Sequence, residues 1–233
     1  DWDFIKVSPA SSFCLVDWGA EDRWVGGDEG NREYTRRVIA QAEGWTWLAR
    51  QDPAQGALAR QIECLRLIHD GVGEEIPFIQ TVFSPLAQAK NLAGQDRLIV
   101  HLRRSPEKVK AGLETITQTT LAFIERAKET GIAGIYYAVQ LANYGLLTEA
   151  EYREFGEPYD RRILAAVADC WLNLAHLHGR EGMFDLVAQY PIHALNWHDQ
   201  ESGPSLREGQ ARFRGAVCGG LEQAGYLACR GGV

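Results

Sequence analysis

The chain has 233 residues, of which 45% are hydrophobic, enough for a domain with a large buried core, so a disordered chain is not expected. A formal net charge of −7, with no Lys/Arg block interleaved with aromatic residues, argues against nucleic-acid binding, because the phosphates would be repelled. The five scattered cysteines lack a Cys-x-x-Cys spacing, and no run of about 18 apolar residues occurs, so we expect a cytoplasmic protein without disulfides, zinc fingers or membrane spans.

The first residues already have the composition of a strand, which we expect over 3–8. A chain that opens inside a strand is expected to lack its beginning. The segment 20–52 carries Trp24 and two further tryptophans among charged residues and glycines, and this pattern predicts a long loop or a hairpin. An amphipathic helix is expected over 54–70.

From residue 77 onward, short apolar runs alternate with amphipathic segments, which is typical of strand-helix units around a parallel sheet. A strand is predicted over 77–83, where Ser84-Pro85 closes it. Ser105-Pro106-Glu107 then offers an N-cap, a proline at the first helical position and an acidic first turn. It predicts a long helix over 105–131, followed by a strand over 134–139.

The second half of the chain continues this alternation. Thr148 and Glu151 form a capping-box pattern that begins a helix, and Pro158 predicts a kink or two abutting helices. Helical segments are also expected to begin near Gly182 and Ser205. Further apolar runs predict strands over 170–177, 193–197 and 216–221.

The six predicted strands are hydrophobic on both faces, as strands between a filled interior and outer helices must be. They predict a single α/β domain over 1–233 of the TIM-like (β/α)8 barrel type, with 20–52 over the barrel mouth. Such a barrel closes with eight strands, so we expect a barrel truncated at both ends. The tail 225–233, which stops where a helix and a strand should follow, favours the same expectation.

Several motifs occur in an order and at spacings that match one known family over nearly the whole chain. They resemble the uroporphyrinogen decarboxylase superfamily, which contains the decarboxylases of haem biosynthesis and zinc-dependent methyltransferases that take methyl groups from corrinoid proteins. The resemblance implies a (β/α)8 barrel, often dimeric in the decarboxylases, with its substrate cleft at the strand C-termini. The matching motifs are Asp3-Phe4-Ile5-Lys6-Val7 with Asp17-Trp18-Gly19, Pro77-Phe78-Ile79 with Ser84-Pro85-Leu86, the segment 147–155 with Pro158-Tyr159, His176-Leu177-His178-Gly179, and Gly219-Gly220-Leu221.

For a decarboxylase, the resemblance implies arginines that hold substrate carboxylates, an aspartate, a tyrosine and a serine at successive strand ends, and a C-terminal histidine. At the three strand-end positions this chain has Ser8-Pro9, Asn91 and Ala142. The arginines and the last histidine would lie outside the chain. The family-level expectation is a carboxy-lyase that acts without a cofactor on a tetrapyrrole-type or related carboxylated substrate.

For a methyltransferase, the resemblance implies a His-x-Cys pair at a strand end and a distant cysteine that together hold zinc. At the matching place this chain has His176-Leu177-His178-Gly179. Residues two apart on a strand point the same way, so both imidazoles can converge on one metal. The best third ligands within the chain are His198 and Asp199, and the partner implied is a corrinoid protein.

The sequence therefore gives two sets of candidate site residues and three hypotheses about the function of the protein. Each candidate also has a structural interpretation: the histidines can be hydrogen-bonded core residues, the aromatic side chains can pack, and Cys218 can be a buried small hydrophobe. The third hypothesis, after a decarboxylase and a methyltransferase, is that the chain is a non-catalytic barrel fragment. The candidates are His176, His178, His198 and Asp199 for catalysis, the first two of them as metal ligands, and Tyr136, Tyr137, Gln140, Asn91 and Trp24 for substrate binding.

Overall fold

The computed structural model of the protein describes residues 3–26 and 32–222. Asp1 and the tail 225–233, on which the expectation of missing ends depends, lie outside these residues. Within them no helix combines the length and the apolar character needed to cross a membrane.

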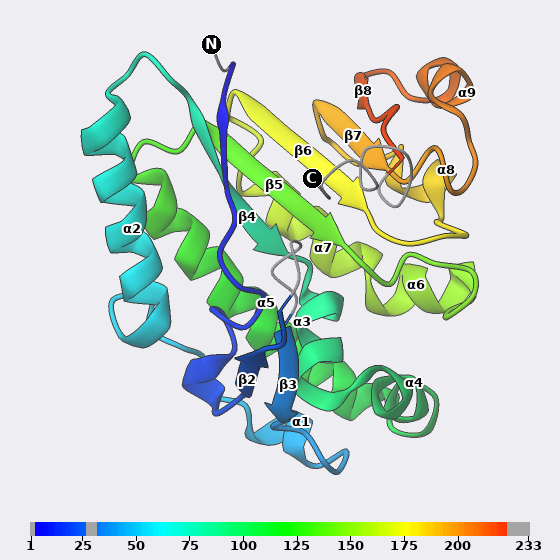
Figure 1. The fold of residues 1–233 in the computed structure, drawn as a ribbon. Helices are drawn as coiled ribbons and strands as arrows, with labels where there is room; N and C mark the ends of the chain where they lie inside the picture. The colour runs from blue at the N-terminus through cyan, green and yellow to red at the C-terminus, as the bar shows by residue number, and fades with distance from the viewer. Residues whose placement is uncertain (1–2, 27–31, 223–233) are drawn as a thin grey trace.

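A parallel sheet of six strands forms the centre of the molecule (Figure 1). Every neighbouring pair in the sheet is parallel, which confirms the predicted α/β class. Within the described residues β1 and β8 are the two edges of the sheet, so it is open there. The last strand ends at Cys218, three residues earlier than expected. The order is β1 (Ile5–Val7), β4 (Phe78–Phe83), β5 (Gly134–Val139), β6 (Leu172–Leu177), β7 (Ala194–Trp197) and β8 (Ala216–Cys218).

Helices pack behind the sheet, with α5 as the longest of those described (Figure 1). Capping boxes at Thr148 and Ser205 begin α6 (Glu149–Phe155) and α9 (Leu206–Arg212), where the sequence predicted helices to begin. α6 and α7 (Glu157–Ala165) abut at Gly156, with Pro158 in the first turn of α7. The sequence analysis missed the short helix at Gly44–Trp47 and both helices between Pro85 and Arg104. The first of the latter two was missed because Ser84 not only closes β4 but also caps α3 (Pro85–Ala93) by accepting a hydrogen bond from the Ala87 amide. The helices are α2 (Gly56–Val72), α3 (Pro85–Ala93), α4 (Gln95–Arg104), α5 (Pro106–Lys128), α6 (Glu149–Phe155), α7 (Glu157–Ala165), α8 (Phe184–Val187) and α9 (Leu206–Arg212).

The described parts of the segment 20–52, residues 20–26 and 32–52, lie beyond the C-terminal end of β4 (Figure 1). The segment contains an antiparallel hairpin of β2 (Glu21–Trp24) and β3 (Arg32–Arg36) and the short helix α1 (Gly44–Trp47), after a 3-10 turn at Val16–Trp18. Its three tryptophans differ in burial. Trp45 is buried and donates from Nε1 to His101 Nδ1 at 3.0 Å, whereas Trp24 and Trp47 are exposed.

The two faces of the sheet carry different side chains, since direction alternates along each strand. Register places Ala138, His176, Asn196 and Cys218 in one row across four strands, on the face that also carries Tyr136. The opposite face is buried and mostly apolar, with Gln80 and Asn173 as its buried polar residues, and Tyr137 belongs to it. The functional side chains therefore gather on the face opposite the helices.

A buried carboxylate ties the helical layer to the sheet. Asp160 of α7 accepts hydrogen bonds from the hydroxyl groups of Tyr137 and Tyr152, each at 2.5 Å, and of Tyr190 at 2.8 Å. Burial raises the pKa of Asp160 to about 6, although the three hydroxyl donors oppose this rise. One side chain thus links β5, α6, α7 and the segment after α8.

Candidate active site

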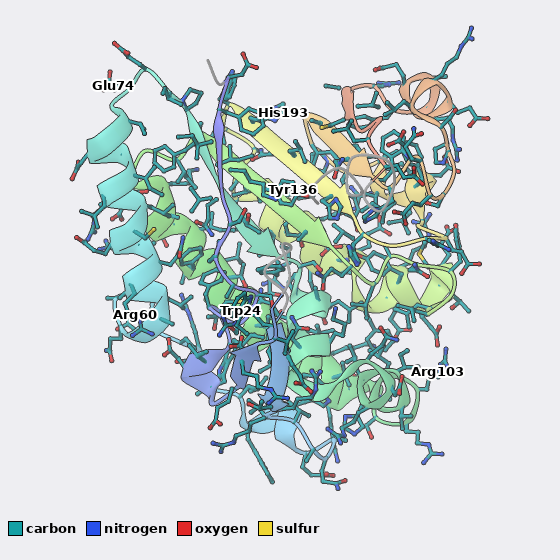
Figure 2. The ribbon with its side chains drawn as sticks, in the orientation of Figure 1. Trp24, Arg60, Glu74, Arg103, Tyr136 and His193 are labelled. Carbon is teal, nitrogen blue, oxygen red and sulfur yellow. The ribbon has the colours of Figure 1, made fainter. Side chains whose placement is uncertain are left out.

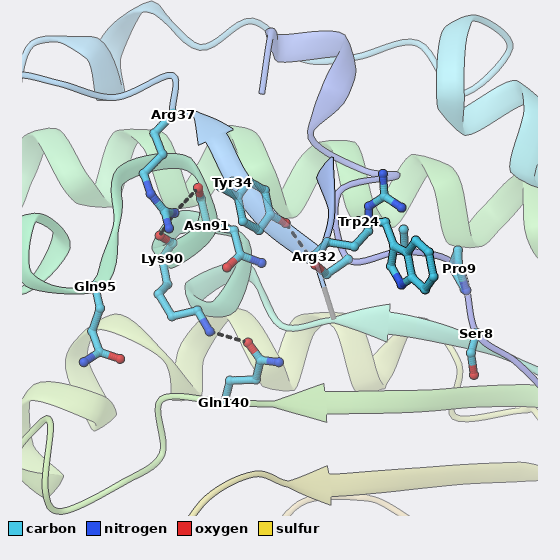
Figure 3. A pocket seen from close by; sticks show the side chains of 12 residues that line it. Ser8, Pro9, Trp24, Arg32, Tyr34, Arg37, Lys90, Asn91, Gln95 and Gln140 are labelled. Carbon is cyan, nitrogen blue, oxygen red and sulfur yellow. Dashed lines mark hydrogen bonds between the residues drawn. The ribbon is translucent and has the colours of Figure 1, made fainter. Parts of the chain in front are cut away.

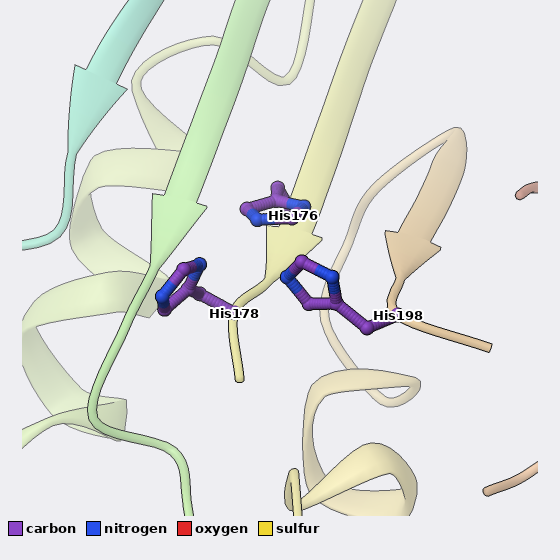
Figure 4. A group of neighbouring side chains, drawn as sticks. All are labelled: His176, His178 and His198. Carbon is purple, nitrogen blue, oxygen red and sulfur yellow. The ribbon is translucent and has the colours of Figure 1, made fainter. Parts of the chain in front are cut away.

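Three histidines converge at the C-terminal ends of β6 and β7 (Figure 4). His176, His178 and His198 each offer one ring nitrogen, and these three nitrogens lie within 4.8 Å of one another. The ring centroids are separated by 5.7 Å for His176 and His178, 5.4 Å for His176 and His198, and 5.3 Å for His178 and His198. We call this group the histidine cluster.

Strand geometry explains the convergence. His176 and His178 are two residues apart at the end of β6, so their side chains leave the same face. The amide of His178 still donates to the Val139 carbonyl at 2.9 Å, and Gly179 then turns the chain with a φ of +90°. His198 follows β7, the neighbouring strand, at the same edge of the sheet.

Asn196 fixes which nitrogen of His176 faces the cluster. Its Nδ2 donates to the Cys218 carbonyl at 2.7 Å, so its Oδ1 is the atom that lies 2.5 Å from Nδ1 of His176. An amide oxygen can only accept, so Nδ1 of His176 carries the proton and donates. Nε2 of His176 is therefore the nitrogen with a lone pair available to a ligand.

The surroundings of His176 favour its neutral imidazole. Burial lowers the pKa of His176 to about 4, and the neighbouring His178, His198 and Lys6 lower it further, whereas the hydrogen bond that His176 donates to Asn196 raises it. Nε2 of His198 is buried and has no hydrogen-bond partner within the described ranges. A buried ring nitrogen without a partner, next to two other imidazoles, fits a metal ligand better than a structural histidine.

Aromatic and cationic groups line the sheet beside the cluster. Tyr136 lies on β5 within the sheet (Figure 2). Its ring stacks on His176 with centroids 5.7 Å apart, and Lys6 Nζ lies 4.0 Å from the centre of the Tyr136 ring. On the other side is a hollow of about 280 Å³ whose lining includes His176, His198 and Cys218. Cys218 is exposed there rather than a buried small hydrophobe, because β8 is an edge strand.

A larger cavity of about 730 Å³ opens between the hairpin, α3 and the end of β5 (Figure 3). It brings together three of the candidate substrate-binding residues, Trp24, Asn91 and Gln140. Its lining also includes Lys90, whose Nζ donates to Gln140 Oε1 at 2.7 Å. The full lining is Ser8, Pro9, Ala10, Ser11, Trp24, Arg32, Tyr34, Arg37, Lys90, Asn91, Gln95 and Gln140.

Two candidates lie apart from these sites. Tyr137 is fully buried on the helical face, where it donates to Asp160, so it does not line the cavity. Asp199 accepts from the Gly220 amide at 2.8 Å and from Gln200 Nε2 at 2.7 Å, and it is not part of the histidine cluster. Sequence reasoning missed Asn196 and Lys90, although the spacing of Asn196 from His198 was a usable signal, since residues two apart share a face.

Comparison with known proteins agrees with this architecture. The sequence model described as uroporphyrinogen decarboxylase (URO-D) matches residues 25–230. A uroporphyrinogen decarboxylase of Syntrophotalea carbinolica is 27% identical over 145 residues, which cover 58% of this chain and 42% of that protein. A methylcobamide:CoM methyltransferase (MtbA) of Methanosarcina acetivorans is 22% identical over 134 residues, which cover 58% of this chain and 39% of that protein.

Among solved structures, a methyltransferase from Methanosarcina mazei superposes with a TM-score of 0.80 at 15% sequence identity. It covers 93% of this chain and 64% of its own, and at this identity it supports the fold alone. The matched region spans about two fifths of the curated relatives' length. Because the family match extends over most of the residues, the chain belongs to the uroporphyrinogen decarboxylase family.

Proposed function

We propose that the chain forms the metal-binding part of a zinc-dependent methyltransferase, which moves a methyl group from a corrinoid protein to a thiol acceptor. His176, His178 and His198 would be the zinc ligands. The observation that carries this proposal is the convergence of the three imidazole nitrogens within 4.8 Å of one another. The similarity to a methylcobamide:CoM methyltransferase supports the same chemistry.

The donor set fits zinc. Zinc binds imidazole nitrogen, and catalytic sites with three protein ligands leave a fourth position for water or substrate. When bound, zinc would lower the pKa of a thiol in that position, so that the nucleophilic thiolate forms at neutral pH. Three neutral imidazoles in place of a His-x-Cys pair and a distant cysteine give a harder ligand set with less donated charge.

The surrounding residues have separate tasks in this proposal. Asn196 holds the ring of His176 in the tautomer with an available Nε2 lone pair. Tyr136 covers one side of His176 and limits access of water from that side. Lys6, over the Tyr136 ring, disfavours protonation of His176 and so keeps its ligand form.

Decarboxylation of a carboxylated substrate is the second candidate function, and it was the first expectation from the sequence. The cavity beside Lys90 favours it, because cations and amides there can hold carboxylates. Three residues differ from those that the resemblance implies for a decarboxylase. Ser8 lies where an aspartate is implied, Asn91 where a tyrosine is implied, and Ala142 where a serine is implied. The histidine cluster has no evident task in a cofactor-free decarboxylase, and this ranks methyl transfer higher.

Metal analysis combined with a transfer assay tests the proposal. Protein purified without chelator and then dialysed is expected to retain one zinc per chain. Methylcobalamin mixed with that protein and 3-mercaptopropionate should lose its methyl group, which the corrinoid absorption spectrum reports. Absence of bound zinc after incubation with equimolar zinc would remove the proposal and leave decarboxylation as the better candidate.

Asn196 gives a more specific prediction. Asn196→Leu should weaken zinc binding about 10- to 100-fold without abolishing it, because the ligands remain but the His176 ring is no longer held in one tautomer. Competition with a chromophoric chelator measures this affinity. Asn196→Asp, which keeps an acceptor for Nδ1, should retain or strengthen binding, and equal weakening in both variants would contradict a tautomer-fixing role.

A further inference from the structure

Cys218 is placed differently from the other cysteines. Of the four cysteines in the described residues, it alone lies on a strand of the central sheet, at the end of β8 and beside β7 (Figure 1). Its register partner on β7 is Asn196, which in turn pairs with His176 on β6. Side chains in one such row leave the same face of a sheet, so the Cys218 thiol lies on the face that carries the histidine cluster.

Hydrogen bonds connect the backbone of Cys218 to the cluster. Asn196 Nδ2 donates to the Cys218 carbonyl at 2.7 Å, and Asn196 Oδ1 lies 2.5 Å from Nδ1 of His176. One amide side chain therefore fixes the end of β8 beside the His176 ring. The thiol itself is exposed.

The thiol and two of the histidines share one hollow. The hollow of about 280 Å³ beside the cluster has His176, His198 and Cys218 in its lining. Nε2 of His198 is buried without a hydrogen-bond partner within residues 3–26 and 32–222. A sulfur donor and an imidazole nitrogen that lacks a partner thus border the same space.

A sulfur donor in this place suits the charge of the cluster. Three neutral imidazoles leave a divalent metal with both of its positive charges, whereas a thiolate neutralises one of them. Tetrahedral zinc takes four donors, so a set of three histidines has room for one more. The Cys218 sulfur is not part of the group of ligand atoms that lie within 4.8 Å of one another. It would complete a four-donor set by rotation about its single side-chain torsion.

We propose that Cys218 is a fourth, displaceable ligand of the metal at the histidine cluster, and that it receives the proton of the acceptor thiol when that thiol displaces it. This inference rests on the proposed function, which supplies both the metal and the acceptor thiol. Cys218 adds to the three histidines and replaces none of them. Its role is to keep the fourth position closed until a thiol arrives.

The exchange of one sulfur for the other conserves charge and protons. The acceptor enters as a thiol, its S–H bond breaks, and its sulfur takes the position that the Cys218 sulfur leaves. The proton passes to the Cys218 sulfur, so one thiol and one thiolate are present before and after this step. The acceptor thiolate then takes the methyl group, and the electron pair of the broken bond stays on the corrinoid cobalt. The neutral thioether leaves as Cys218 rebinds and releases its proton to solvent.

Cobalt(II) in place of zinc tests this assignment, because a thiolate bound to cobalt(II) gives a charge-transfer absorption band. We expect the band in wild-type protein without any added thiol. Cys218→Ser should lose it and keep the ligand-field bands of the histidine-bound metal. Cys64→Ser is the matched control, since Cys64 is also exposed but lies on α2, and this variant should keep the band.

Proton release upon thiol binding is a second measurement, made with zinc-loaded protein and a pH indicator in weak buffer near neutral pH. Thiols lose their proton when they bind a metal, so 2-mercaptoethanol should release about one proton per site from Cys218→Ser. Wild-type protein should release far less, because Cys218 takes the proton. Cys218→Ser should also bind zinc more weakly, by at least the roughly 10-fold that loss of an outer-shell partner costs.

The outcomes separate this inference from the proposed function. A cobalt(II) site without a charge-transfer band in wild-type protein, a band that persists in Cys218→Ser, or equal proton release from both proteins would overturn the role of Cys218 and leave the metal site in place. Failure of the wild-type protein to bind either cobalt(II) or zinc would remove the proposed function, and the role of Cys218 with it.

Discussion

Replacing His176 with alanine is expected to abolish stoichiometric zinc binding. The ring centroid of His176 lies 5.7 and 5.4 Å from those of His178 and His198, and loss of this side chain leaves only two imidazoles for a metal. Outer-shell changes cost about 10- to 100-fold in metal affinity, and loss of a direct ligand should exceed this range. Zinc content after dialysis, and affinity from chelator competition, are the measurements.

His193→Ala is the matched control for this prediction. His193 precedes β7, at the opposite end of the strand that leads to His198, and its Nδ1 accepts a hydrogen bond from the Asn173 amide at 2.9 Å. The substitution removes an imidazole of the same size without touching the cluster, so zinc binding should persist. Full zinc retention in His176→Ala, or equal loss in His193→Ala, would contradict the assignment of the cluster as the metal site.

The pair of histidines in His176-Leu177-His178 could be predicted from the sequence because strand periodicity alone places alternate residues on one face. His198 was predicted as a third ligand for a related reason, since it follows the next strand. The sequence offered Asp199 beside His198 as a third ligand and could not show which of the two belongs to the histidine cluster. The backbone turn after β7 directs its carboxylate to the Gly220 amide, a contact made 21 residues away.

The cavity was less predictable than the cluster. Trp24, Asn91 and Gln140 were candidates, but the residues that give the cavity its charge come from the hairpin and from α3, a helix that the sequence analysis did not predict. Ser84-Pro85 was interpreted only as the end of a strand, although the same pair is also an N-cap followed by a proline at the first helical position. Without that helix, Lys90 had no assigned position beside Gln140.

Residue type alone could not show which of Tyr136 and Tyr137 lies at the candidate site. Both were candidates for substrate binding, yet consecutive residues on a strand face opposite ways, so at most one could line the site. The register with β6 places Tyr136 on the His176 face. Tyr137 instead takes part in the helical layer, where its hydroxyl contributes to the buried Asp160 network. Its partner could not be identified without knowing where α7 packs.

The buried network around Asp160 gives the largest stability effect among the substitutions proposed for this protein. Asp160→Ala should reduce the free energy of unfolding by about 3–5 kcal/mol, because the hydroxyl groups of Tyr137, Tyr152 and Tyr190 would lose their buried acceptor together. Domains of this size have about 5–15 kcal/mol in total, so the loss is a large fraction. Urea unfolding followed by circular dichroism measures it. Tyr190→Phe, which removes one donor and leaves the carboxylate two others, should cost about 1 kcal/mol.

The pH dependence of this loss distinguishes the carboxylate from simple loss of side-chain volume. The pKa of Asp160 is raised from 3.8 to about 6 in the folded chain, so the folded state binds this proton more tightly than the unfolded state. The contribution of Asp160 to stability is therefore full below pH 3.8 and declines as the pH rises through about 6. Other carboxylates cancel in the difference between wild type and Asp160→Ala, so that difference should be larger at pH 4.5 than at pH 7.5. A difference independent of pH would mean that the cost arises from the cavity left by the side chain and not from a carboxyl group whose pKa is raised by burial.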